Sequence, residues 1–174
     1  IEPQLLNNAF QEILKRHDAL RSIFSLDGKF FFIKEYKPQP VRFLDLSSSA
    51  NKESDLENLK QAQVSEKIDL FNGPCFFATL AKFSTDHYVL IITGHHIICD
   101  GWSIGIMLQD LGAIYSAYVE NKTPDVAPPI PFTAYANEEQ TFSNSEENKE
   151  TEKFWFEIYE NSIPVVNVPT DNPR

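Results

Sequence analysis

Two adjacent histidines, His95 and His96, follow one of the longest apolar runs of the chain, residues 88–93, after a single glycine. An imidazole can exchange a proton near pH 7, and it can also ligate zinc or activate a cysteine thiol. Cys99 and Asp100 come within the next four residues. The segment therefore has the residue types for acid–base, metal or thiol chemistry.

The spacing of these residues favours acid–base chemistry. Adjacent residues of a strand point to opposite faces, so we expect one histidine to face the interior or bond its own loop and the other to face a cleft. Zinc needs three or four converging ligands, so no metal site is expected. Cys99 follows two isoleucines, and we expect it to fill a buried position as a protonated thiol.

Two structural alternatives remain open for this segment. Asp100 precedes a predicted helix that starts near Trp102, where a carboxylate can cap the first turn. His96 could be a core histidine with both ring nitrogens bonded. An acyl-transfer site is the functional alternative, and Gly101 would permit the tight turn that such a loop needs.

Apolar spacing, composition and turn residues together predict the elements that position this segment. Leu6, Phe10, Ile13 and Leu14 form a stripe that predicts a helix over residues 2–20. The remaining predicted elements are a hairpin of 22–26 and 29–34 around Asp27-Gly28, a short strand 41–44, a helix 51–67, a second hairpin of 75–83 and 87–93, and helices 103–119, 132–140 and 146–159. Because 87–93 is apolar on both faces, it should lie in the middle of a mixed sheet covered by helices, in an α/β fold.

Composition restricts the class of protein. The chain has 174 residues with 15 Lys and Arg against 25 Asp and Glu, a net charge of −10. This charge disfavours nucleic acid and anionic membranes as partners, and no apolar run reaches the ~20 residues of a membrane-spanning helix. Two cysteines without a secretory signal favour the reduced cytoplasm. Acidic residues between 138 and 152 indicate a solvated face or a basic partner.

Three segments resemble, in the right order, motifs of the condensation domains of nonribosomal peptide synthetases. Residues 94–103 are similar to the H-H-x-x-x-D-G signature. Residues 16–24 resemble the R-H-E-x-L-R-T-x-F motif, with Asp18 in place of Glu and Ser22 in place of Thr. The third segment, residues 132–136, is a weaker likeness of an aromatic motif, and the pair Phe154-Trp155 and residues 168–174 are similar to the Y-W and L-P-x-D-x-P-R stretches of the family.

The resemblance implies a fold and a reaction. The expected fold is a chloramphenicol-acetyltransferase-like lobe, one half of a two-lobed, V-shaped domain. Residues 1–174 would be its N-terminal lobe, truncated at both ends and inactive alone. The implied reaction joins an acyl or peptidyl thioester on an upstream carrier protein to the amine of an aminoacyl thioester on a downstream carrier.

The resemblance also implies the partners of the reaction. Both substrates would travel on 4'-phosphopantetheine arms, with no permanently bound cofactor. The expected partners are the two carrier domains, the C-terminal lobe and an adjacent adenylation domain. Three other functions stay open: an epimerising relative, an acyltransferase that uses coenzyme A or a carrier, and an inert docking platform, although such platforms tend to lose the histidine.

Site residues follow from the same resemblance. His96 would act as base or as positioner of the amine, Gly101 would face the substrate tunnel, and Asp100 would pair with Arg16 or Arg21 in a buried ion pair. The expected catalytic motif is His95, His96, Asp100 and Gly101, supported by Arg16, Arg21, Trp102 and Ser103.

Overall fold

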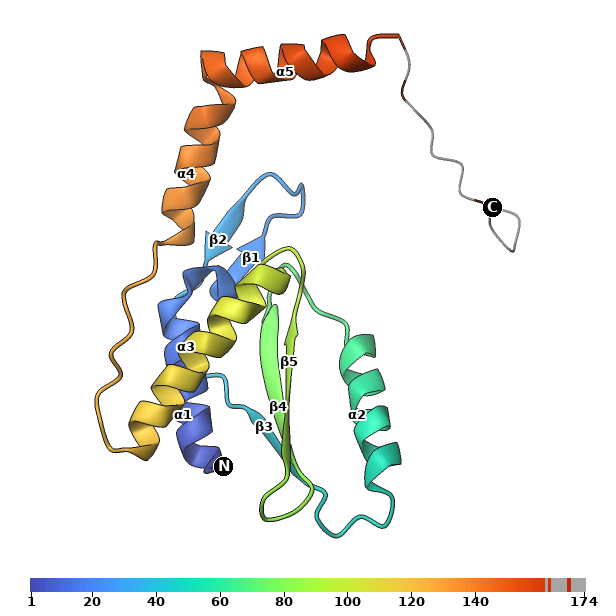
Figure 1. Cartoon of the computed structure of the whole chain (residues 1–174), viewed down its shortest axis with the longest axis vertical. Coiled ribbons are helices and arrows are strands. Elements are labelled where there is room, and N and C mark those ends of the chain that lie inside the picture. Colours follow the sequence, from blue (N-terminus) through green and yellow to red (C-terminus); the bar gives the residue numbers. More distant parts are fainter. Residues whose placement is uncertain (162, 164–168, 170–174) are drawn as a thin grey trace. The chain divides into compact units, whose positions relative to one another are not determined.

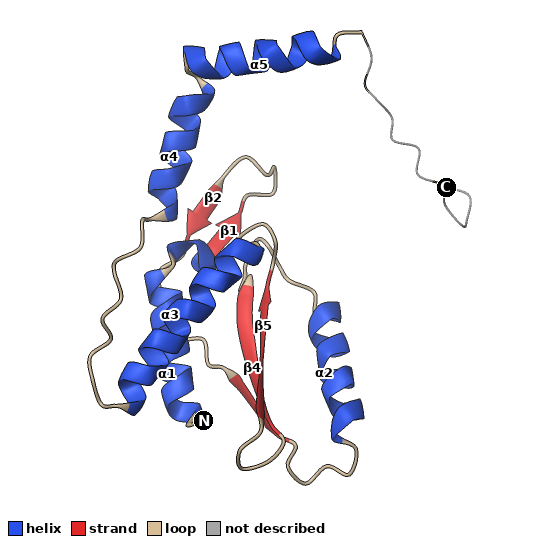
Figure 2. Ribbon diagram, viewed as in Figure 1, coloured by secondary structure: helices blue, strands red, loops and turns tan. Residues whose placement is uncertain are grey.

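The computed structural model describes residues 1–161, 163 and 169, and residues 1–132 form one compact unit while residues 133–174 form another. The motif expected at 168–174 therefore lies outside the described residues, apart from Pro169. Figure 1 labels the elements and Figure 2 separates helices from strands. The elements of the first unit are α1 (Pro3–Arg16), η1 (Asp18–Arg21), β1 (Ser22–Phe24), β2 (Phe31–Ile33), β3 (Arg42–Asp45), α2 (Lys52–Ser65), β4 (Phe76–Lys82), β5 (Tyr88–Gly94) and α3 (Gly101–Val119).

The main sheet has the order β3-β4-β5, with β3 parallel and β5 antiparallel to β4. This confirms a mixed sheet in an α/β fold. Helices α1 and α3 lie side by side on one face, and α2 lies on the opposite side (Figure 1). Alternate residues of β4, such as Phe76 and Leu80, enter the core with α1 and α3. The Phe76 ring stacks on the Phe10 ring with centroids 5.6 Å apart.

The predicted place of the 87–93 strand in the sheet is wrong. Within the described residues β5 pairs only with β4, so β4 is the central strand and is buried along six of its seven residues. Each residue of β5 is half-buried. An apolar run indicates contact on both faces of a strand, but it does not indicate how many strands flank it.

Two predicted boundaries shift for local reasons. The first helix ends at Arg16 rather than Leu20, because His17 adopts an extended conformation and a 3-10 turn follows. The first hairpin forms as predicted, but its loop is longer than the Asp27-Gly28 pair, since the Ser25 N–H donates to the carbonyl of Phe30 at 2.9 Å. Gly28 has φ +69°, which explains the glycine.

The stretch between α3 and residue 132 is extended and proline-rich, yet it is attached to the first unit. The Val126 side chain packs against the core. The Phe132 N–H donates to the Asp18 carboxylate at 2.9 Å, and the Phe132 and Phe31 rings lie 5.2 Å apart. These contacts make the stretch part of the first unit rather than a free linker.

The second unit contains α4 (Phe132–Ser143, whose first residue belongs to the first unit) and α5 (Glu146–Tyr159). Ser145 caps α5 by accepting the Asn148 N–H at 3.1 Å. The aromatic pair Phe154-Trp155 lies on α5 and is exposed. In the part of the chain that the structure describes, no helix has the length and hydropathy to cross a bilayer.

Candidate functional site

The chain turns sharply after β5, and His95 forms the inside of that turn. Its backbone N–H donates to the Cys75 carbonyl at 2.9 Å, which continues the β4–β5 ladder by one rung. The Ile97 N–H donates to His95 Nδ1 at 3.1 Å, and the Ile98 N–H donates to the His95 carbonyl at 3.0 Å. Because Nδ1 accepts, the neutral ring carries its proton on Nε2. His95 is therefore a structural element of the turn.

His96 faces away from the packed chain. It is exposed, and among residues 1–161 its imidazole has no hydrogen-bond or ion-pair partner. The expectation that one histidine bonds its own loop is confirmed for His95, whereas the cleft expected beside the other histidine stays a prediction. The alternative of a core histidine with both nitrogens bonded is wrong for His96.

Asp100 caps α3. Its carboxylate accepts the Ser103 N–H at 2.8 Å and the Ser103 hydroxyl at 2.7 Å, and Asp100 is exposed. The backbone bond from Ser103, followed by the hydroxyl bond, lowers the pKa of the Asp100 carboxyl. The capping alternative raised from the sequence is confirmed, and Trp102 next to it is 82% exposed.

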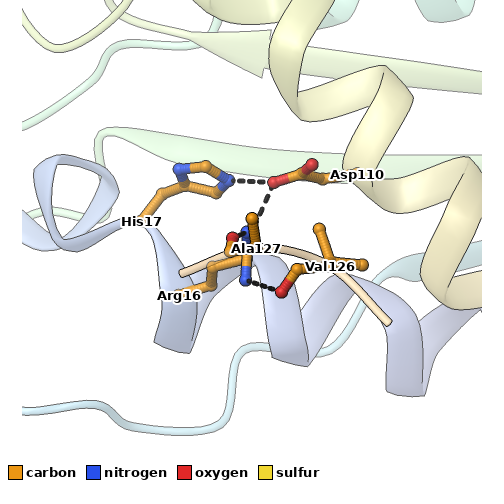
Figure 3. Close-up of polar contacts among 5 residues, drawn as sticks. All are labelled: Arg16, His17, Asp110, Val126 and Ala127. Atoms are coloured by element: carbon orange, nitrogen blue, oxygen red, sulfur yellow. Dashed lines mark hydrogen bonds and ion pairs between the residues drawn. The ribbon is translucent and has the colours of Figure 1, made fainter. Parts of the chain in front are cut away.

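The expected pairing of Asp100 with Arg16 or Arg21 is wrong within the described residues. Arg16 Nε binds the Asp110 carboxylate of α3 at 2.8 Å (Figure 3). The Arg21 guanidinium donates to the carbonyls of Leu14, Lys15 and Lys34. Arg21 thus satisfies carbonyl groups at the end of α1 and joins that helix to Lys34, the residue after β2.

The group around Asp110 joins three segments that lie far apart in sequence. His17 Nε2 lies 2.9 Å from the same Asp110 oxygen that Arg16 binds. Arg16 also donates to the carbonyls of Val126 and Ala127 (Figure 3). The side chains of Arg16 and Asp110 are 16% and 15% exposed. Sequence reasoning missed Asp110, although a carboxylate beside the buried stripe of α3 is the signal that could have found it.

Cys99 is packed against the end of β5. It is buried, and burial followed by the nearby charge of Asp100 raises the pKa of its thiol. Burial also raises the pKa of the Cys75 thiol. The prediction that Cys99 is a buried filler is confirmed, and neither thiol has the exposure of a nucleophile. The residues that the structure describes contain no group of three metal-ligating side chains.

Gly94 is required by the packing of Cys99. A Cβ at position 94 would lie 2.6 Å from Cys99 Sγ and 3.1 Å from the Phe76 ring. We expect Gly94→Ala to lower the free energy of unfolding by about 1–3 kcal/mol, measured by denaturant titration, because the added methyl overpacks the site. Adding Cys99→Ala should restore part of the loss. Gly112→Ala, with open space around it, is the control, and an equal loss there would contradict this explanation.

The capping role of Asp100 makes a second prediction. Asp100→Ala should lower the melting temperature by a few degrees, whereas Asp100→Asn should keep it, because asparagine caps as well as aspartate. The lowered pKa means that the ionised cap stabilises the fold above about pH 4, the unfolded value, and that this contribution is lost as pH falls through the folded pKa. A large melting loss in Asp100→Asn would instead indicate a required charge.

A family model described as Condensation domain matches residues 1–174. Malpinin synthetase of Mortierella alpina is 31% identical over 172 residues, covering 97% of this chain. Gramicidin S synthase 2 of Brevibacillus brevis is 29% identical over 180 residues, covering 100%. The match spans 2% of the length of the first of these relatives and 4% of the second.

Solved structures show the same fold. The starter condensation domain of rhizomide synthetase has a TM-score of 0.84 at 24% identity, over 92% of this chain and 40% of that one. The epimerization domain from the third module of tyrocidine synthetase B has a TM-score of 0.84 at 27% identity, over 100% of this chain and 40% of that one. VibH, described as a condensation enzyme, has a TM-score of 0.77 at 21% identity, over 94% and 38%. The expected chloramphenicol-acetyltransferase-like fold is confirmed, and the chain spans about two-fifths of these structures.

Proposed function

The chain belongs to the condensation domain family of nonribosomal peptide synthetases, and from this premise we propose that residues 1–174 are the N-terminal lobe of a domain that forms an amide bond between two carrier-bound substrates. The upstream carrier holds an acyl or peptidyl thioester, and the downstream carrier holds an aminoacyl thioester. Both would arrive on phosphopantetheine arms, and an adenylation domain of the same synthetase would load the amino acid. The chain alone, without the second lobe, is expected to be inactive.

The observation that carries this proposal is the exposed imidazole of His96, which has no partner in the part of the chain that the structure describes and which follows a hydrogen-bonded turn. Two backbone hydrogen bonds, at the N–H and the carbonyl of His95, and a third from the Ile97 N–H to the His95 Nδ1 hold the turn. The cap of Asp100 on Ser103 fixes the following helix. A catalytic group must be held within about 0.5 Å of its productive position, which such a turn supports.

The reaction balances with His96 in one of two roles. The amine nitrogen attacks the thioester carbonyl, the N–C bond forms, the C–S bond breaks, and the thiolate of the donor arm leaves with a proton. His96 either accepts the proton that the amine releases or accepts a hydrogen bond that orients the amine. Positioning alone can account for about 7–11 kcal/mol of the barrier.

The test uses the intact domain with both lobes, a donor carrier loaded with an acyl group and an acceptor carrier loaded with an amino acid. Intact-protein mass spectrometry should show that the acceptor carrier gains the mass of the donor acyl group. A folded protein that leaves both carriers unchanged would overturn the proposal. Inversion of the acceptor Cα without mass gain would assign the chain to the epimerising relatives, consistent with its 27% identity to an epimerization domain.

Gly101 gives a prediction for the acceptor side. A Cβ at this position meets nothing within 4 Å, so Gly101→Leu should leave the melting temperature unchanged. If the tunnel passes Gly101, leucine should lower transfer by more than about tenfold, because a displaced acceptor loses its orientation. Gly112→Leu on the same helix, also with open space around it, is the matched control. Normal transfer by Gly101→Leu would remove Gly101 from the tunnel wall.

A further inference from the structure

A single buried amide joins α2 to the two longest strands of the sheet. Gln63 is 5% exposed although α2 is otherwise a polar surface helix. Its Nε2 donates to Thr79 Oγ1 of β4 at 2.6 Å, and its Oε1 accepts the Thr93 hydroxyl of β5 at 2.7 Å. Thr79 is 1% exposed. The side-chain amide is therefore bonded at both its nitrogen and its oxygen, to one buried and one half-buried threonine.

The two threonines are diagonal neighbours on one face of the sheet. In the β4–β5 register Thr79 lies opposite Ile91, and Thr93 lies opposite Phe77. Alternation places this face opposite the one that packs on α1 and α3. Gln63 thus contacts one residue of each strand at positions two apart in register.

The contacts of Gln63 matter for the register of β5 because the sequence of β5 specifies that register weakly. Residues 88–92 are apolar on both faces, so a slip would exchange one apolar side chain for another. Within the described residues β5 has one neighbouring strand, and the Ser84–His87 turn, which sets the hairpin register, lies at the end of β5 remote from His95. A slip of two residues would move Thr93 by about 6.6 Å and leave a buried amide oxygen without a donor.

The register of β5 in turn determines where the turn that contains His95 and His96 begins. Gly94 lies opposite Phe76, and the next rung is the bond from the His95 N–H to the Cys75 carbonyl. Thr93 is two residues before His95 and three before His96. A shift or fraying of this strand end would displace the whole turn.

We propose that Gln63 is a positioning residue that fixes the end of β5 and thereby the place of His96. The fixing of the strand end stands on the hydrogen bonds alone, whereas its importance for catalysis rests on the proposed function. Gln63, Thr79 and Thr93 together form a register lock for the strand.

The test compares Gln63→Met with Gln61→Met in the intact domain. Both variants replace an amide with an apolar side chain of similar length, but Gln61 is exposed and bonds only Glu57 at 3.1 Å. Hydrogen exchange followed by mass spectrometry should show the amides of residues 93–95 exchanging about tenfold faster in Gln63→Met, with β3 and the start of α1 unchanged. The imidazole NMR signal of His96 should shift in the same variant. Gln61→Met should match the wild type in both measurements.

The catalytic readout is a split of the kinetic constants. Gln63→Met should lower kcat by about tenfold or more with little change in KM for either carrier, because a displaced catalytic group acts on the transition state. Equal exchange rates and an unmoved His96 signal in Gln63→Met would overturn the register lock. Faster exchange in Gln63→Met with a normal kcat would overturn the positioning role. A wild type that transfers nothing would overturn the proposed function, and the exchange and NMR results would then still decide whether Gln63 fixes the register of β5.

A second pair of variants, at Thr93, tests the proposal if Gln63→Met does not fold. Thr93→Val keeps the shape of the side chain and removes the hydroxyl, whereas Thr93→Ser keeps the hydroxyl. We expect Thr93→Val to reproduce the faster exchange and the lower kcat and Thr93→Ser to restore both. Identical behaviour of the two variants would contradict the proposal.

Discussion

Replacing His96 with alanine should lower the rate of amide formation by about 10²- to 10⁴-fold, the usual contribution of a positioned acid–base group. The melting temperature should stay close to that of the wild type, because His96 is exposed and its ring has no partner among the described residues. The measurement is single-turnover transfer between loaded carriers, with thermal melting of the same samples. Activity and stability should therefore separate at this position.

Two further variants sharpen the His96 result. His87→Ala removes another exposed histidine, in the turn before β5, and should leave transfer unchanged. His96→Asn can orient an amine by a hydrogen bond but cannot take up a proton at neutral pH. Activity retained in His96→Asn and lost in His96→Ala would indicate a positioner, and loss in both, with an acid limb in the wild-type pH–rate profile, would indicate a base. Full transfer by His96→Ala would place the chemistry elsewhere.

Replacing Asp110 with alanine should produce the largest loss of stability, about 3 kcal/mol in the free energy of unfolding. The change leaves the Arg16 guanidinium largely buried without its carboxylate, and it removes the partner of His17. The melting temperature should fall as well, by less per kcal/mol than in a small domain because the shift becomes smaller as the chain becomes longer. Denaturant titration of the intact domain measures the free energy directly.

The control for Asp110 is a carboxylate with a similar pairing at the surface. Glu120 lies 2.6 Å from Lys122 with more than half of its side chain exposed, so Glu120→Ala should change stability little. Asp110→Asn keeps the volume and one acceptor oxygen, and it should fall between the wild type and Asp110→Ala. Equal stability of Asp110→Ala and the wild type would mean that desolvation of Arg16 and Asp110 cancels their attraction.

The sequence predicted those features that depend on neighbours along the chain. Alternation along a strand predicted that His95 and His96 would differ in environment, and the capping rule predicted the bond from Asp100 to Ser103. Apolar periodicity located α1 and α3, composition located α2, and turn signals between β-type runs located both hairpins. These signals are local, so one chain segment is enough to read them.

Features that depend on distant segments could not be predicted in the same way. Arg16 has several carboxylates within its possible reach, and its choice of Asp110 over Asp100 depends on how α1 packs against α3. Gln63 lies in a helix whose composition is typical of a surface, and nothing in its own segment indicates that the amide is buried. The position of β5 in the sheet depends on strands remote in sequence.

The attachment of residues 120–131 determines where the first unit can be cut. A fragment that ended with α3 would lose the Val126 side chain from the core and two carbonyl acceptors of Arg16. A fragment extended through Phe132 keeps these contacts and the bond to Asp18. Limited proteolysis should therefore spare the proline-rich stretch, and a minimal folding fragment of this unit ends beyond those prolines, well past the last turn of α3.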